Sequence, residues 1–129
     1  MQLNSNIDFR ITGWITKIEI FNLYKFEKPN LFLNLSTSEG LAVSIMEACS
    51  FGIPIIATNV GGTPELVDYN GVLVDKNITP SELAELIIDY AHKSEETVNN
   101  YSMVSFNKFK LELDANKTKG ELIELLFNL

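Results

Sequence analysis

The feature that most constrains the fold is a predicted helix that is apolar on nearly every face and lies between two apolar strands. Residues 31–35 have the length and composition of a buried strand, a polar turn follows at 36–40, and residues 41–51 form the helix. Residues 55–58 are a short continuous apolar run, typical of a strand that is covered on both faces. Strand, helix and strand in this order form the unit of a parallel sheet, so the segment predicts an α/β protein.

One acidic residue interrupts this helix. Glu47 lies at helical spacing from Ser44 and Gly40, which places the three residues on one face. The first N–H groups of a helix have no partner within it, and the helix dipole adds partial positive charge there. The amides of Gly40, Leu41 and Ala42, which we call the helix mouth, therefore suit a phosphate or diphosphate.

Two carboxylates flank the helix mouth. Glu39 precedes it and Glu47 follows it, and ionised carboxylates can only accept hydrogen bonds, which suits the hydroxyls of a sugar. Phosphate and hydroxyl recognition together suggest a nucleotide sugar. The alternative is that Glu39 is an ordinary acidic residue near a helix start and that Glu47 turns outward to water.

Paired glycines follow the next strand. Gly61 and Gly62 permit positive φ and close approach of a ligand, although on their own they indicate only a tight turn. Ligands of parallel sheets bind beyond the carboxyl ends of the strands. The Glu39 loop and the Gly61-Gly62 loop are both expected at that edge, where they predict one shared site.

The motif around these residues resembles retaining glycosyltransferases of the GT-B fold, family 4, whose signature is E-x7-E. The family pattern runs S-x-x-E-G, then E-A-x-x-x-G-x-P-(I/V)-(I/V)-A, then V-G-G-x-x-E. This chain matches it at Ser36, Glu39-Gly40, Glu47-Ala48, Gly52, Pro54 to Ala57 and Val60 to Glu65. Weaker similarity covers almost the whole chain, but only the later part of the enzyme.

The resemblance implies a function in glycan biosynthesis, the transfer of a hexose from a nucleoside diphosphate sugar to a hydroxyl with retention of anomeric configuration. Glu39 is then the catalytic residue and holds the donor-sugar hydroxyls, while Glu47 binds the ribose hydroxyls. The helix mouth stabilises the departing diphosphate. The implied donor-binding residues are Gly40, Leu41, Ala42, Val43, Glu47, Gly61, Gly62 and Trp14.

Trp14 has two interpretations. By resemblance the loop that contains it lies beside the nucleotide base, whereas a lone tryptophan more often covers the end of a core. No metal ion and no cofactor is implied, because the sequence has no Asp-x-Asp pair and no His cluster.

The chain departs from the family pattern. Two parts of the family enzymes have no counterpart in this sequence: the upstream strand–helix units, whose Arg and Lys bind the diphosphate, and the acceptor-binding domain. Residues 1–129 are therefore expected to be a partial donor-binding domain. Such a domain is not expected to transfer sugar on its own. Directly after Glu39-Gly40, this chain has Leu41-Ala42, where the family more commonly has an aromatic-glycine or a leucine-proline pair. Two other classes stay open, a catalytically inactive nucleotide-binding module and a structural or interaction fragment.

Composition excludes several classes of function. A formal net charge of −7 argues against nucleic acid as a partner. No apolar segment approaches the roughly 18 residues that a membrane-spanning helix needs, and residues 1–10 lack a signal-peptide pattern. Cys49 is the only cysteine, which predicts a reducing cytoplasm and a packing role for the thiol.

The remaining elements complete an α/β fold, a parallel sheet with helices on both faces and a helical C-terminus. This corresponds to an incomplete Rossmann-like C-terminal half of a GT-B enzyme. The clearest helix begins at Thr79-Pro80-Ser81-Glu82, a capping box with proline at the first helical position. Further strands are predicted at 7–11 and 72–74, a short helix at Glu65, and further helices at 16–24, 97–110 and 119–127.

The strand order predicts an exposed edge. Doubly wound sheets have the order 3-2-1-4-5-6, and by resemblance the strands near 7–11, 31–35, 53–58 and 72–74 correspond to the third through sixth. The strand at 31–35 then has an open edge and the strand at 7–11 has no neighbour. Because an apolar open edge invites pairing, the isolated chain is expected to pair these two strands or to self-associate through them.

Overall fold

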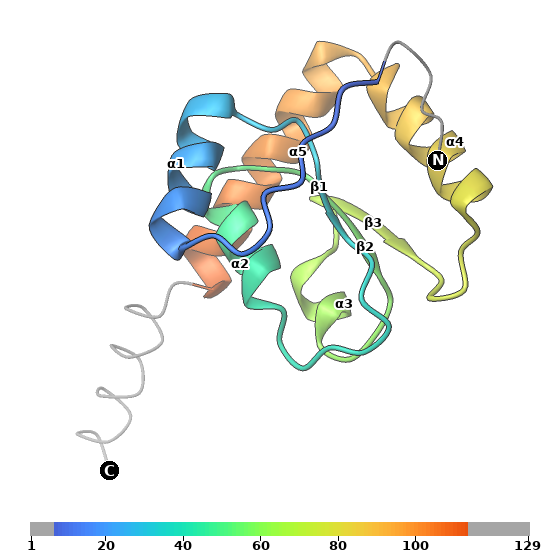
Figure 1. The fold of residues 1–129 in the computed structure, drawn as a ribbon, viewed down its shortest axis with the longest axis horizontal. Helices are drawn as coiled ribbons and strands as arrows, with labels where there is room; N and C mark the ends of the chain where they lie inside the picture. Colours follow the sequence, from blue (N-terminus) through green and yellow to red (C-terminus); the bar gives the residue numbers. More distant parts are fainter. Residues whose placement is uncertain (1–6, 114–129) are drawn as a thin grey trace.

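The structure, a computed structural model, describes residues 7–113 as an alternation of helices and short strands (Figure 1). The helix predicted at 119–127 lies outside the described residues. The elements are α1 (Lys17–Glu27), β1 (Phe32–Asn34), α2 (Val43–Ser50), β2 (Ile55–Thr58), α3 (Thr63–Leu66), β3 (Gly71–Val74), α4 (Pro80–Ala91), α5 (Glu95–Lys108) and a π-helical turn at Phe109–Leu113.

The three strands form a parallel sheet in the order β1-β2-β3. Ile55 of β2 is in register with Phe32 of β1 and with Gly71 of β3. All four residues of the central strand β2 are buried, as its continuous apolar run predicts. Helices α1, α2 and α5 lie to one side of the sheet and α4 to the other, which confirms the α/β class (Figure 1).

The strand predicted at 7–11 is wrong. The segment has no regular secondary structure, and Ile11 is 85% exposed. Its apolar residues alternate as in a strand, but within the described residues no strand lies beside it. The backbone N–H and C=O groups of 7–11 therefore have no neighbouring strand with which to form sheet hydrogen bonds. The expected pairing of 7–11 with 31–35 is therefore wrong too, since β1 has β2 as its one strand partner among residues 7–113.

Helix α2 buries one face in the core. Its Ile45, Ala48 and Cys49 are fully buried and pack against Ile55 and Ala57 of β2 in a single core cluster. This confirms the packing role of Cys49, whereas the helix is not interior on every side, because Val43 and Ser44 in its first turn are exposed. Burial raises the pKa of the Cys49 thiol, which keeps the thiol neutral.

Helix α2 starts two residues later than the sequence predicts. Ala42 is its N-cap, in an extended conformation with φ −73° and ψ 91°, so the helix begins at Val43. The N–H of Gly62 donates to the carbonyl of Gly40 at 2.9 Å, which holds the preceding segment as a loop. Contact with a neighbouring loop, which sequence periodicity does not report, sets this boundary.

The other helices begin where their caps indicate. The capping box at Thr79 and Glu82 is formed, and Thr16 and Glu19 form the same arrangement at the start of α1. Glu65 lies in the first turn of α3, as expected for an acidic residue that favours the helix dipole. Helix α5 is capped by Ser94 and begins at Glu95, two residues before its predicted start.

Candidate functional site

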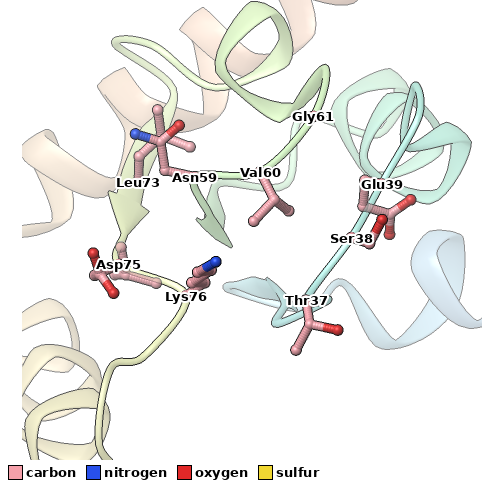
Figure 2. Close-up of a pocket in the computed structure, with 10 residues that line it drawn as sticks. Thr37, Ser38, Glu39, Asn59, Val60, Gly61, Leu73, Asp75 and Lys76 are labelled. Carbon is pink, nitrogen blue, oxygen red and sulfur yellow. The ribbon is translucent and has the colours of Figure 1, made fainter.

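A cavity opens at the carboxyl ends of all three strands (Figure 2). Three loops form it, one after each strand, and its volume of about 570 Å³ lies within the range of roughly 300–1,000 Å³ that small-molecule sites occupy. Its position is the expected one for a ligand of a parallel sheet. The lining residues are Thr37, Ser38, Glu39, Asn59, Val60, Gly61, Leu73, Val74, Asp75 and Lys76.

The structure brings the Glu39 loop and the Gly61-Gly62 loop into direct contact. Gly61 has a φ of +51°, and a Cβ atom on it would lie 1.7 Å from the carbonyl oxygen of Glu39. A Cβ atom on Gly62 would lie 2.7 Å from the carbonyl oxygen of Gly40. Only glycine fits at these two positions, so the pair serves the contact between loops as well as the approach of a ligand.

One oxygen of the Glu39 carboxylate is held by two donors. Ser36 Oγ donates to Glu39 Oε1 at 2.6 Å, and Asn34 Nδ2 lies 3.4 Å from the same oxygen. Within the described residues, Oε2 accepts no hydrogen bond. The hydroxyl of Thr58 donates to the carbonyl of Ser36, which ties the loop to the end of β2. Glu39 is thus fixed on one side and open to a ligand on the other.

Glu47 does not line this cavity. Its side chain is only 17% exposed, and its Oε1 lies 3.1 Å from Nζ of Lys17 on α1. The interpretation in which Glu47 turns outward to water is therefore wrong. Burial raises the pKa of Tyr24, and the negative charge of Glu47 raises it further. The partnership with Lys17 results from the packing of α1 against α2, and no local sequence signal reports it.

The helix mouth and Trp14 lie outside the cavity lining. Leu41 and Val43 are exposed, whereas Ala42 is buried. Trp14 is 88% exposed, so it does not cover the end of the core. Of the residues expected from sequence, the cavity lining thus contains Glu39 and Gly61, and the next residues of the two loops, Gly40 and Gly62, are joined by a backbone hydrogen bond.

Sequence reasoning missed the opposite wall of the cavity. Asn59 follows β2, and Asp75 and Lys76 follow β3. Their signal was available, because polar residues directly after strands of a parallel sheet lie at the ligand-binding edge. Asp75 Oδ1 accepts the N–H of Asn77 at 2.8 Å, and in the view of Figure 2 Lys76 lies between Asp75 and Thr37.

The described residues contain no group of three His, Cys, Asp or Glu side chains that could hold a metal ion. Among them there is also no helix long and apolar enough to cross a membrane. The absence of metal and cofactor expected from the sequence stays a prediction.

The parallel sheet with its helices is an α/β fold, consistent with the Rossmann-like C-terminal half of a GT-B glycosyltransferase. Residues 2–103 match the family described as "Glycosyl transferases group 1". The chain belongs to this family.

Curated relatives agree with this assignment. The chain is 31% identical over 107 residues to the O-antigen biosynthesis glycosyltransferase WbnH of Escherichia coli, a match that covers 81% of this chain and 30% of WbnH. It is 28% identical over 109 residues to sucrose synthase 2 of Pisum sativum, covering 81% of this chain and 13% of that protein. A shorter match, 43% identical over 56 residues, involves a GDP-mannose-dependent alpha-(1-6)-phosphatidylinositol monomannoside mannosyltransferase of Mycobacterium tuberculosis, with 40% and 14% coverage. The chain therefore spans less than a third of the length of these relatives.

Proposed function

We propose that this chain is the donor-binding part of a retaining glycosyltransferase of family 4, with Glu39 and Glu47 as its E-x7-E pair. The reaction is transfer of a hexose from a nucleoside diphosphate sugar to a hydroxyl acceptor, in the cytoplasm, without a metal ion or cofactor. The observation that carries the proposal is the Glu39 carboxylate, which is fixed through Oε1 and open through Oε2 at the wall of the cavity.

In this proposal Glu39 is the catalytic residue and accepts hydrogen bonds from the donor-sugar hydroxyls. Gly61 and Gly62 let the sugar approach the backbone closely. The amides of the loop and first turn, Gly40 to Val43, stabilise the diphosphate as it leaves with growing negative charge. The late start of α2 supports a contribution from Val43, because it is the first residue of the helix and its N–H has no acceptor within the helix.

Two further roles concern the nucleoside. Glu47 binds the ribose hydroxyls, and Trp14 contacts the base. The exposure of Trp14 supports such a contact, since its ring is free to stack. Lys17 already occupies one oxygen of Glu47, so the ribose is accepted through the other oxygen, Oε2, or in place of Lys17.

The test separates the two glutamates by the part of the donor that each contacts. UDP and GDP are titrated calorimetrically beside UDP-glucose and GDP-mannose. Glu39→Gln should weaken binding of the nucleotide sugar by about 1.5–3 kcal/mol and leave binding of the free nucleoside diphosphate almost unchanged, because charge-assisted hydrogen bonds of that strength are lost. Glu47→Gln should weaken both ligands equally, because both contain the ribose.

Glu85→Gln is the matched control, since Glu85 is an exposed residue of α4 outside the cavity. The proposal fails if the wild-type chain binds none of the four ligands. The assignment of the glutamates fails if the chain binds and both variants match the control.

A further inference from the structure

A second cavity lies at the amino ends of β1 and β2, the opposite end of the sheet from Glu39. We call it the amino-edge cavity, and its lining residues are 24–25, 28–30, 51–54 and, on α5, 98, 99 and 102. Its volume of about 410 Å³ falls within the range of roughly 300–1,000 Å³ of small-molecule sites. It shares no lining residue with the cavity that contains Glu39, so it is a separate site.

The amino-edge cavity is positively charged. Lys25 and Lys28, at the C-terminal end of α1, line it, and none of its described lining residues is acidic. Glu27 forms a 2.8 Å ion pair with Arg10 outside the cavity, and the ammonium of Lys25 lies over the neutral ring of Phe26. In a chain with a formal net charge of −7, two lysines without an acid favour an anionic ligand.

Lys28 holds a backbone conformation that most residues avoid. It is the C-cap of α1, with φ 47° and ψ 65°, a left-handed conformation in which glycine is usual. Among residues 7–113 it is the one non-glycine residue with a positive φ, and its ammonium has no ion-pair partner there. Backbone preference therefore does not explain a lysine at this position, whereas a role for its charge does.

The walls of the amino-edge cavity are fixed, while its amide groups are free. The carbonyl of Asn30 accepts the hydroxyl of Tyr90 at 2.9 Å, and the hydroxyl of Ser102 donates to the carbonyl of Gly52. The α1–β1 and α2–β2 connections, which both pass α5, are thereby tied to helices (Figure 1). Within the described residues, the side-chain amides of Asn30 and Asn99 form no hydrogen bond, so they can bind polar groups of a ligand.

One wall of the amino-edge cavity is aromatic. The rings of Tyr24 and Phe51 meet edge to face with their centroids 5.6 Å apart, and Pro54 beside them is fully buried. Such a surface suits the carbon skeleton of a ligand, because it removes apolar area from water. The cavity thus combines a cationic rim with an apolar wall.

We propose that the amino-edge cavity binds a small phosphate monoester, with its phosphoryl group on Lys25 and Lys28 and its organic part against Tyr24 and Phe51. A phosphate monoester carries close to two negative charges at neutral pH, which matches two ammonium groups. An ammonium binds phosphate as a compact point charge with three donors, which does not require a rigid geometry. The inference does not depend on the proposed function, because the two cavities are separate.

The experiment uses the whole 129-residue chain and phenyl phosphate, which combines a ring with a phosphate monoester. Benzoate, with a single charge, and phenol, with none, are titrated in parallel, and binding is followed in NMR spectra of the backbone amides. The variants are Lys28→Gln, Lys28→Arg and Lys28→Gly. Lys93→Gln is the control, since Lys93 is exposed after α4, lines neither cavity and changes the net charge equally.

Phenyl phosphate should shift the amides of Lys28, Asn30 and Gly52, and phenol and benzoate should bind more weakly. Lys28→Gln should weaken phenyl phosphate about tenfold, because a charged hydrogen bond to phosphate is lost. Lys28→Arg should retain most of the affinity, and the wild-type affinity should fall as salt is added.

Lys28→Gly separates a lost contact from a damaged fold. It should lose as much affinity as Lys28→Gln but should not unfold at a lower urea concentration than the wild type, because glycine adopts φ 47° without steric cost. A wild type that does not bind phenyl phosphate would overturn the inference. So would amide shifts centred on Gly61, equal affinities of Lys28→Gln and Lys93→Gln, or benzoate bound as tightly as phenyl phosphate.

Discussion

At the scale of single residues, Glu39 depends on its neighbours for its orientation. Ser36 donates to Oε1 at 2.6 Å, and Asn34 links the same oxygen to Ser44 in the first turn of α2 through two contacts of 3.4 Å. The Ser36 hydroxyl is the shorter contact and therefore the stronger restraint on the carboxylate. Ser36 acts as a positioning residue, because it reaches the proposed sugar only through Glu39.

This arrangement predicts the effect of Ser36→Ala. Removal of the hydroxyl should weaken binding of the nucleotide sugar by about 1.5 kcal/mol, the lower end for a hydrogen bond to a charged group, and should spare the free nucleoside diphosphate. Calorimetric titration of both ligands measures the difference. Ser81→Ala, on the exposed surface of α4, is the control. Equal weakening of both ligands by Ser36→Ala would show a general loss of structure and contradict a positioning role.

At the scale of elements, the capping box of α4 couples helix stability to pH. The backbone N–H of Thr79 donates to Glu82 Oε2 at 2.8 Å and the hydroxyl of Thr79 donates to the same oxygen at 2.7 Å, and these bonds lower the pKa of Glu82. A carboxyl whose pKa is lower in the folded state stabilises the fold above its unfolded value, near 4.5. That contribution is lost as pH falls through the folded pKa.

The resulting prediction concerns Glu82→Gln. The variant should be less stable than the wild type at neutral pH, and the difference should shrink as pH falls below about 4.5. Urea unfolding followed by circular dichroism at a series of pH values measures it. Glu85→Gln, on the same helix but outside the cap, should keep the wild-type pH profile. Parallel profiles for Glu82→Gln and the wild type at every pH would refute the coupling.

At the scale of the whole molecule, β1 leaves one edge of the sheet unpaired within the described residues. The N–H of Phe32 donates to the carbonyl of Pro54 toward β2, so the N–H and C=O of the next residue, Leu33, point to the open side. Leu33 and Leu35 are partly exposed along this edge. Unpaired backbone groups beside apolar side chains are a template for another strand.

We therefore expect the isolated chain to self-associate through β1 in a concentration-dependent manner. Leu33→Lys should reduce the association, because an edge lysine cannot be buried against a second strand without loss of its hydration. Sedimentation equilibrium over a range of concentrations measures the effect, and Ile88→Lys on α4 is the control, because it replaces another exposed apolar residue away from the edge. A wild type that stays monomeric throughout, or a Leu33→Lys variant that associates like Ile88→Lys, would show that the edge is not the contact.

The sequence by itself determined the elements whose signals are local. Thr79 to Glu82 specify a helix start through contacts three residues apart, and the apolar run at 55–58 specifies a buried strand. The order of strand and helix indicated a parallel sheet, and with it the edge at which Glu39 and Gly61 meet.

Only the tertiary structure decided which residues contact one another across elements. The alternating residues at 7–11 form no strand because a strand requires a neighbour, which local pattern does not supply. Glu47 meets Lys17 because α1 packs beside α2, and Lys76 lines the same cavity as Glu39 because β3 and β1 both flank β2. These contacts join residues far apart in the sequence, and their geometry depends on packing between elements that no single segment encodes.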